Sequence, residues 1–501
     1  MVVCVCVRGQ REREREREER RGEEMGDEET MKYGSTSGDK PQMMDGSSVW
    51  VWGEGNFGLL GLGAERCDDP VFRPTPLAPA EGSDAPERAS ALAVGGMHTV
   101  IVSANATATP FSWGVNDEKA LGRDADAENS ALPGRVSVPG ASGSKLVAAS
   151  CGNSHTLFLS EDGRVFGCGT FRDDGPLGFS PGVRIQDGAV EIAIPGLSTT
   201  KVGGGARKRK RGAGEKSVIH TTTTAFATTK TAGDDSREYI IKVASGGDHA
   251  VMLSNRGNAF TVGYGGHGQL GRCGSRFSSP ARELEAYVVP VRVNIPKSAG
   301  KVVDVFCGDK NTIFVTEKRK VYGCGLNNYG QLGVKGDGNG ILRKPTLIPG
   351  LTGRTLKSVA CGAEHTLAVV VDDDTGASSV VSFGRAAYGR LGRNIGEEQS
   401  SGGDASVPVP GVVNFEDEDA GEPIAVAAGT AVSAAIMNSG LLFTWGCGES
   451  FLHAKGDDDD DEPMPRRVKR TKRWNGHKVV DVAFGGQHAV ILCQPMEGSA
   501  L

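Results

Sequence analysis

The sequence predicts an all-β fold, a seven-bladed β-propeller that is closed by pairing of its N- and C-terminal strands. Three observations support this prediction. Two half-motifs recur along the chain, and each of them occurs seven times. Glycine accounts for 73 of the 501 residues, which indicates many tight reversals of the chain. The two sets of half-motifs are staggered, so that each end of the chain carries one unpaired half.

The first half-motif is G-x-x-H, set between two short apolar runs. Five copies keep the histidine and two copies have lost it. The apolar runs contain β-branched residues and are flanked by turn residues, so we expect each of them to form a short strand. The complete copies lie at residues 95–98, 152–155, 246–249, 362–365 and 485–488, and the degenerate copies at 308–311 and 429–432.

The second half-motif begins with an apolar residue and glycine, as in Trp52-Gly53, and usually ends in Leu-Gly. The first copy has no G-x-x-H before it, and the last G-x-x-H, at residues 485–488, has no such partner after it. If each half supplies two strands, the C-terminal pair completes the N-terminal pair in one sheet, which leaves no exposed edges. A solenoid is the alternative architecture, but it needs capping repeats, and the chain shows none.

We expect the propeller to span residues 47–494, with three segments outside its blades. Residues 1–46 form a low-complexity tail rich in alternating Arg and Glu, for which disorder is favoured over a charged helix. Residues 197–238 form a disordered loop insert, and residues 495–501 a short tail. A basic run in the insert predicts a nuclear localisation signal and an importin partner, with a solvated charge run as the alternative. The run consists of Arg207, Lys208, Arg209, Lys210 and Arg211.

Composition and motifs argue against several classes of protein. No apolar run reaches the length of a membrane span, and residues 1–7 lack the features of a secretory signal, so we expect no membrane partner. Three of the 11 cysteines precede the glycine of G-x-x-H, where Val, Ser and Ala also occur, so we expect reduced, buried thiols in an intracellular protein. No P-loop, Cys-x-x-Cys or Gly-x-Ser-x-Gly motif is present, so we expect no covalent catalysis, cofactor or metal.

The combined unit, V-A-x-G-x-x-H-x-x-x-L followed by (W/F)-G-x-x-x-x-G-x-L-G, resembles the repeat of the regulator of chromosome condensation family. The resemblance covers about residues 50–492 and is closest to members that exchange guanine nucleotide on the small GTPase Ran, through residues 163–178, 243–271 and 382–392. It implies a monomeric, nuclear, chromatin-associated exchange factor without covalent chemistry. It also implies Ran, nucleosomal histones and DNA as partners, and roles in nucleocytoplasmic transport and the cell cycle.

The motif histidines allow two interpretations. A histidine repeated at one point of a structural unit is explained by hydrogen bonds to nearby backbone. Because equivalent turns of a propeller emerge on one face, the same histidines would also form a ring on one surface, with Asp248 and Glu364 among them. A ring of histidine and acidic groups would suit the docking of a protein. This ring would contain His98, His155, His249, His365 and His488.

The resemblance implies a GTPase-binding site on that face. It carries the family's functional positions over to Asp248 and to three of the histidines, His98, His365 and His488. Two acidic positions of the family face are amides here, Asn56 and Asn153. Residues 171–179 resemble the family's β-wedge, for which a plain inter-strand loop is the alternative. The wedge residues are Phe171, Arg172, Asp173 and Asp174.

The resemblance also implies chromatin contact through the loop at residues 272–287, with Arg276 and Arg282 as the contact residues. Because the N-terminal tail mixes Arg with Glu, the basic run of the insert is an alternative source of phosphate contacts. A non-catalytic scaffold for protein or chromatin interactions remains the alternative function. A UV-B photoreceptor of the same fold needs clustered tryptophans, and this chain has five in total.

Overall fold

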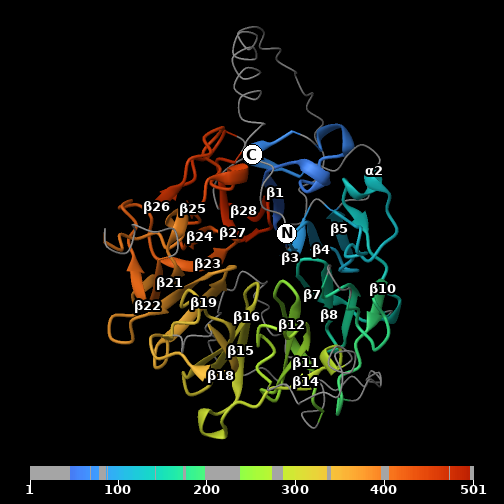
Figure 1. Cartoon of the computed structure of the whole chain (residues 1–501). Coiled ribbons are helices and arrows are strands. Elements are labelled where there is room, and N and C mark those ends of the chain that lie inside the picture. The colour runs from blue at the N-terminus through green and yellow to red at the C-terminus, as the bar shows by residue number, and fades with distance from the viewer. Residues whose placement is uncertain are drawn as a thin grey trace, which may run out of the picture. The chain divides into compact units, whose positions relative to one another are not determined.

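The computed structural model describes residues 46–67, 69–77, 86, 88–141, 143–172, 177–197, 237–272, 286–335, 340–396, 405–472 and 474–496. These residues form seven four-stranded antiparallel sheets arranged as the blades of a propeller, as Figure 1 shows. The predicted fold class is therefore confirmed. Within the described residues, no helix has the length and apolar character needed to cross a membrane.

Six blades are formed by consecutive strands, ordered from the innermost to the outermost strand. Blade 1 contains β3 (Ala89–Val94), β4 (His98–Ser103), β5 (Pro110–Gly114) and β6 (Gly134–Arg135). Blade 2 contains β7 (Leu146–Cys151), β8 (His155–Ser160), β9 (Val165–Gly169) and β10 (Gln186–Glu191). Blade 3 contains β11 (Ile240–Ser245), β12 (His249–Ser254), β13 (Ala259–Gly263) and β14 (Val291–Arg292).

The next three blades repeat this order. Blade 4 contains β15 (Val302–Cys307), β16 (Asn311–Thr316), β17 (Val321–Leu326) and β18 (Ile341–Leu347). Blade 5 contains β19 (Thr355–Cys361), β20 (His365–Val371), β21 (Ser378–Arg385) and β22 (Ser406–Val413). Blade 6 contains β23 (Pro423–Ala428), β24 (Val432–Met437), β25 (Leu442–Gly446) and β26 (Glu462–Arg467).

Blade 7 joins the two ends of the described chain. Its inner strands are β27 (His477–Phe484) and β28 (His488–Pro495), and its outer strands are β1 (Ser48–Gly53) and β2 (Val71–Pro76). β1 and β28 pair without a break from Ser48 opposite Cys493 to Gly53 opposite His488. The predicted closure of the ring is therefore confirmed.

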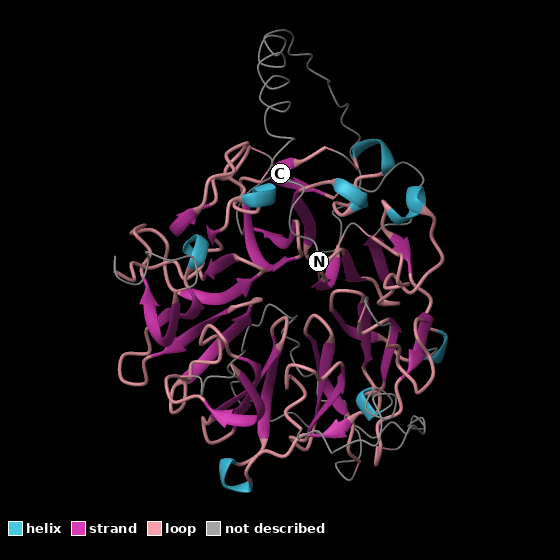
Figure 2. Ribbon diagram, in the orientation of Figure 1, coloured by secondary structure: helices cyan, strands magenta, loops and turns pink. Residues whose placement is uncertain are grey.

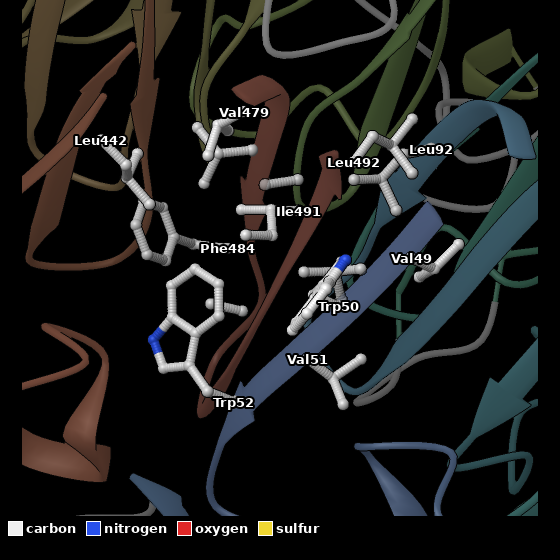
Figure 3. Close-up of a cluster of buried hydrophobic side chains, with 14 of the residues drawn as sticks. Val49, Trp50, Val51, Trp52, Leu92, Leu442, Val479, Phe484, Ile491 and Leu492 are labelled. Carbon is white, nitrogen blue, oxygen red and sulfur yellow. The ribbon is translucent and has the colours of Figure 1, made fainter. Parts of the chain in front are cut away.

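The sheets are held by apolar side chains between neighbouring blades. In Figure 3 the β1 side chains from Val49 to Trp52 lie beside Ile491 and Leu492 of β28. Trp52 is fully buried, and its indole N–H donates to the Leu452 carbonyl of blade 6 at 3.0 Å. The few helical turns lie at the periphery of the ring (Figure 2). They are α2 (Ala127–Ser130), η1 (Asn56–Gly58), η2 (Ala64–Arg66), η3 (Pro139–Ala141), η4 (Lys297–Ala299), η5 (Ala387–Gly389) and η6 (Glu449–Phe451).

Replacing Trp52 with alanine is expected to destabilise the protein by about 3–5 kcal/mol, because the change leaves a cavity in the closing blade and removes a bond to blade 6. The matched control is Phe57→Ala, because the Phe57 side chain is 67% exposed and surface changes usually stay within about 0.5 kcal/mol. Urea unfolding of both variants measures the difference. Equal loss of stability in the two variants would contradict the role of Trp52 in closure.

Candidate functional site

One face of the propeller collects the turns that follow each innermost strand and the loops that follow each third strand. We call it the motif face. Within a blade the two are joined by a backbone hydrogen bond, as from the Tyr264 N–H to the Asp248 carbonyl at 2.8 Å in blade 3. The same bond joins Thr170 to Ser154 at 2.8 Å and Arg385 to Glu364 at 2.9 Å. Residues of both half-motifs therefore share one surface.

A central cavity of about 350 Å³ opens among the motif turns, and their glycines form part of its lining. Backbone hydrogen bonds connect successive turns around it, including Gly96 N–H to the Gly152 carbonyl at 3.1 Å and Asn153 N–H to the Gly247 carbonyl at 2.9 Å. Three thiols line this cavity, Cys151, Cys307 and Cys361, and burial raises the pKa of each of them, to about 12 for Cys151 and Cys361. These thiols are protonated at neutral pH and have little nucleophilic character.

The expectation that the motif histidines form a surface ring is wrong. All five side chains are buried, and none is more than 1% exposed. Each histidine opens the second strand of its blade, where the imidazole turns into the space between blades instead of toward solvent. The histidines therefore support the motif face from below. They are His98, His155, His249, His365 and His488.

Four of these histidines are hydrogen-bonded to a hydroxyl of the next blade. His98 Nε2 lies 2.8 Å from Thr156 Oγ1, and the Thr156 hydroxyl in turn donates to the Ala120 carbonyl at 2.8 Å. Because the hydroxyl proton is used in that bond, Nε2 must be the donor, which fixes the neutral Nε2–H tautomer. The other pairs are His249–Thr312, His365–Ser433 and His488–Thr99.

Sequence reasoning missed these hydroxyl partners, because it sought partners for the histidines in nearby backbone. The signal was present, since a hydroxyl residue follows the last motif position in five of the seven copies: Thr99, Thr156, Thr312, Thr366 and Ser433. The motif glycines follow from the same packing. A Cβ on Gly152 would overlap the His155 imidazole, so a side chain at this position would displace the ring.

Asp248 and Asn153 lie on the motif face in neighbouring blades. Asn153 is exposed and Asp248 is half-buried. Between them, a Cβ on Gly247 would overlap the Asp309 carboxylate and would lie 2.8 Å from Asn153 Nδ2. Asp309 thus adds a carboxylate that the degenerate motif at 308–311 concealed from sequence reasoning, and it forms an ion pair with Lys310 at 3.6 Å.

The other predicted polar residues lie elsewhere on this face. Glu364 is bound by two guanidinium groups, from Arg385 at 2.7 Å and from Arg390 at 3.1 Å, so its charge is neutralised within blade 5. Asn56 begins the 3₁₀ turn η1 of blade 7 and is half-buried. Asp248 and Asn153 are therefore brought together, and Asn56 and Glu364 lie on other blades.

The loop at residues 170–179 contributes both buried and accessible groups. Phe171 is 1% exposed, so it does not contact a partner directly, as a wedge residue would. Arg172 is half-buried, and its guanidinium carbon lies 4.5 Å from the centroid of the Tyr264 ring in blade 3. Asp173 and Asp174 lie outside the described residues.

The predicted chromatin and localisation residues also lie outside the described residues. Arg276 and Arg282 fall between β13 and β14 in the sequence, and Arg207, Lys208, Arg209, Lys210 and Arg211 fall between β10 and β11. Because β11 runs toward the motif turn of blade 3, its first residue, Ile240, lies at the opposite face. Within the described residues, no group of three or more His, Cys, Asp or Glu side chains is placed to hold a metal ion.

Comparison with known proteins agrees with this architecture. A family model for the RCC1-like domain matches residues 48–491. The chain belongs to the regulator of chromosome condensation family. It is similar to the Regulator of chromosome condensation of Xenopus laevis, with 32% identity over 456 residues that cover 89% of this chain and 90% of that protein.

A yeast sequence and a yeast crystal structure extend this family likeness. The Guanine nucleotide exchange factor SRM1 of Saccharomyces cerevisiae is 27% identical over 480 residues, which cover 88% of this chain and 86% of that protein. The crystal structure of Prp20p from Saccharomyces cerevisiae, described with its binding to Gsp1p and histones, matches with a TM-score of 0.71 and 25% identity. That match covers 91% of this chain and 93% of Prp20p.

The buried histidines predict a fold that is labile to acid. Burial lowers the pKa of His98 to about 4 and those of the other four to about 3, against about 6.5 in the unfolded chain. The unfolded state therefore binds more protons below about pH 6.5, and each histidine removes up to about 1.4 kcal/mol of stability per pH unit down to its folded pKa. Asp481 acts in the opposite direction, because desolvation raises the pKa of its carboxyl to about 7. Protonation of this single group therefore stabilises the folded state as the pH falls.

Urea unfolding between pH 8 and pH 4.5 should show a free energy of unfolding that falls steadily below about pH 6.5. The control variant is His365→Asn, which places at this position the residue found in the degenerate copy at Asn311. It should be less stable at pH 8, because it loses the bond to Ser433. Its free energy of unfolding should fall less steeply with decreasing pH, by up to the slope that one bound proton contributes. Stability that stays constant from pH 7 to pH 5 would contradict the neutral, buried histidines.

Proposed function

We propose that this protein is a guanine nucleotide exchange factor for the small GTPase Ran that acts on chromatin in the nucleus. Family membership supports exchange activity, because a relative of similar extent is itself a guanine nucleotide exchange factor. The observation that carries the proposal is the proximity of Asp248 to the base of the 170–179 loop. The Asp248 carbonyl accepts from Tyr264 N–H, and Arg172 stacks on the Tyr264 ring at 4.5 Å.

The mechanism is exchange by competition. A GTPase holds its nucleotide mainly through its phosphate loop and Mg²⁺. If the motif face binds nucleotide-free Ran more tightly than loaded Ran, linkage requires that this protein weaken nucleotide binding by the same factor. No covalent bond is made or broken. The ratio of GTP to GDP then sets the direction of exchange.

The polar groups of the motif face have distinct parts in this proposal. Asp248 supplies negative charge and Arg172 supplies positive charge on the neighbouring blade, while Asn153 and Asn56 supply hydrogen-bond donors and acceptors. Asp173 and Asp174 are proposed to extend this contact. The histidines His98, His365 and His488 act indirectly, because their bonds to hydroxyls of the next blade hold the motif turns in place.

We further propose that Arg276 and Arg282 contact the nucleosome, and that the basic run at residues 207–211 is a nuclear localisation signal recognised by an importin. The support is chemical, because phosphate and acidic protein surfaces attract clustered Arg and Lys. The related Prp20p is described as binding histones.

Replacing Asp248 with alanine is expected to slow the stimulated release of GDP by about 10- to 100-fold, because a charged contact to the nucleotide-free GTPase is lost. Release of fluorescent GDP from Ran measures the rate. Asp117→Ala is the matched control, since Asp117 is an exposed acid on the motif face of blade 1, and its rate should stay within about twofold. An unchanged rate in Asp248→Ala would remove Asp248 from the site, and native protein without effect on Ran would favour the scaffold function.

Charge reversal of both Arg276 and Arg282 is expected to lower nucleosome affinity by about tenfold or more and to flatten its salt dependence, because phosphate contacts release counterions. Deletion of residues 203–216 should abolish importin binding and leave nucleosome affinity within about twofold. Pull-down and titration with reconstituted nucleosomes test both variants. Loss of nucleosome binding in the deletion alone would transfer the chromatin contact to the insert.

A further inference from the structure

The junction between blades 2 and 3 differs from the other junctions where a motif histidine faces the next blade. At four junctions Nε2 of the histidine lies 2.8–2.9 Å from a Thr or Ser hydroxyl of the following blade. In blade 3 the residue at the hydroxyl position is Ala250. His155 of blade 2 is therefore the only one of the five described motif histidines without a hydroxyl partner.

The His155 imidazole is buried and makes no hydrogen bond that would compensate for its loss of hydration. The side chain is 0% exposed, and neither of its two ring nitrogens has a hydrogen-bond partner. Leaving a buried polar group unsatisfied is costly, and a threonine at position 250 would resemble the arrangement at the other junctions. This junction alone leaves a described motif histidine facing a position without a hydroxyl, which calls for a local reason.

Phe171 fills the space beside the His155 ring. The ring centroids of His155 and Phe171 lie 4.6 Å apart, and the Phe179 ring lies 4.6 Å from Phe171 and 6.4 Å from His155. A Cβ on Gly263 of blade 3 would lie 2.8 Å from Phe171 Cδ1, so the glycine leaves room for this ring. Both sides of the junction thus accommodate one phenylalanine from the 170–179 loop.

The same loop is fixed at its base. Phe171 N–H donates to the Leu177 carbonyl at 2.8 Å, and Leu177 N–H donates to the Thr170 hydroxyl at 2.8 Å. The next residue, Arg172, extends onto the Tyr264 ring of blade 3. Two successive residues therefore attach the loop, Phe171 to the interior of the junction and Arg172 to its surface.

We infer that His155, Phe171 and Ala250 are positioning residues for nucleotide exchange. Because Ala250 has no hydroxyl, His155 does not form an interblade hydrogen bond, and its ring packs against Phe171 instead. This packing fixes Phe171, which in turn holds Arg172 over Tyr264 beside Asp248. The exchange role rests on the proposed function. The packing of Phe171 against His155 does not depend on that function and is measured separately.

The first test compares Phe171→Leu with Thr366→Val. Both variants lose an interblade contact, but Thr366→Val removes the hydroxyl that donates to the Gln331 carbonyl at the junction of blades 4 and 5, away from the loop. Phe171→Leu should lower the kcat of GDP release from Ran at least tenfold with KM within twofold, while Thr366→Val should lower the melting temperature and leave kcat within twofold. Equal effects on kcat would contradict a positioning role.

The second test restores the hydroxyl. Ala250→Thr supplies an acceptor for His155, and Ala250→Val adds the same volume without an acceptor. Ala250→Thr should slow exchange at least threefold more than Ala250→Val. Equal rates would show that volume alone matters and would overturn the role assigned to the missing hydroxyl.

Amide hydrogen exchange tests, in the absence of any GTPase, whether the packing of Phe171 against His155 fixes the loop. In Phe171→Leu the amides of Phe171 and Leu177 should lose at least tenfold in protection, and in Thr366→Val they should keep native protection. Unchanged protection in Phe171→Leu overturns the inference even if native protein accelerates release from Ran. If native protein has no effect on Ran, the proposed function fails. Loss of amide protection in Phe171→Leu would still establish that the packing of Phe171 fixes the loop.

Discussion

The pairing of β1 with β28 is the contact on which the rest of the structure depends. It joins the first and last described strands over six residue pairs and places blade 7 between blades 6 and 1. Blade 7 then bonds to both neighbours, through the Trp52 indole to Leu452 and through His488 to Thr99. Without this closure, β1 and β28 would each present an unpaired edge, and the motif turns would not form one continuous face.

The fold was largely predictable from the sequence, because its information is local and repeated. Each half-motif spans only a few residues, and its glycines and apolar runs specify a turn between two strands wherever they occur. The stagger of the two sets also predicted closure, since Trp52-Gly53 and the motif at 485–488 are each incomplete alone.

The site was less predictable, because burial at a blade junction depends on residues far apart in sequence. His98 and its partner Thr156 are 58 positions apart, and His488 and Thr99 are 389 positions apart. Repetition identified the histidines but could not show whether they face solvent. The same limit applies to Phe171, which a loop sequence suggests is exposed and which the junction with blade 3 encloses. Asp309 was missed because its motif copy lacks the histidine.

Repeated residues build the ring, and departures from the repeat distinguish one junction from another. Asp248 and Asn153 occupy variable positions of otherwise regular turns, and Ala250 replaces the hydroxyl of its position next to the loop that carries Arg172. In the proposed mechanism the motif face and the nucleotide compete for one GTPase. The most direct test is the affinity of this protein for nucleotide-free Ran and for Ran loaded with GDP. Competition predicts much tighter binding of the nucleotide-free form and dissociation on addition of excess GDP, and equal affinities would contradict it.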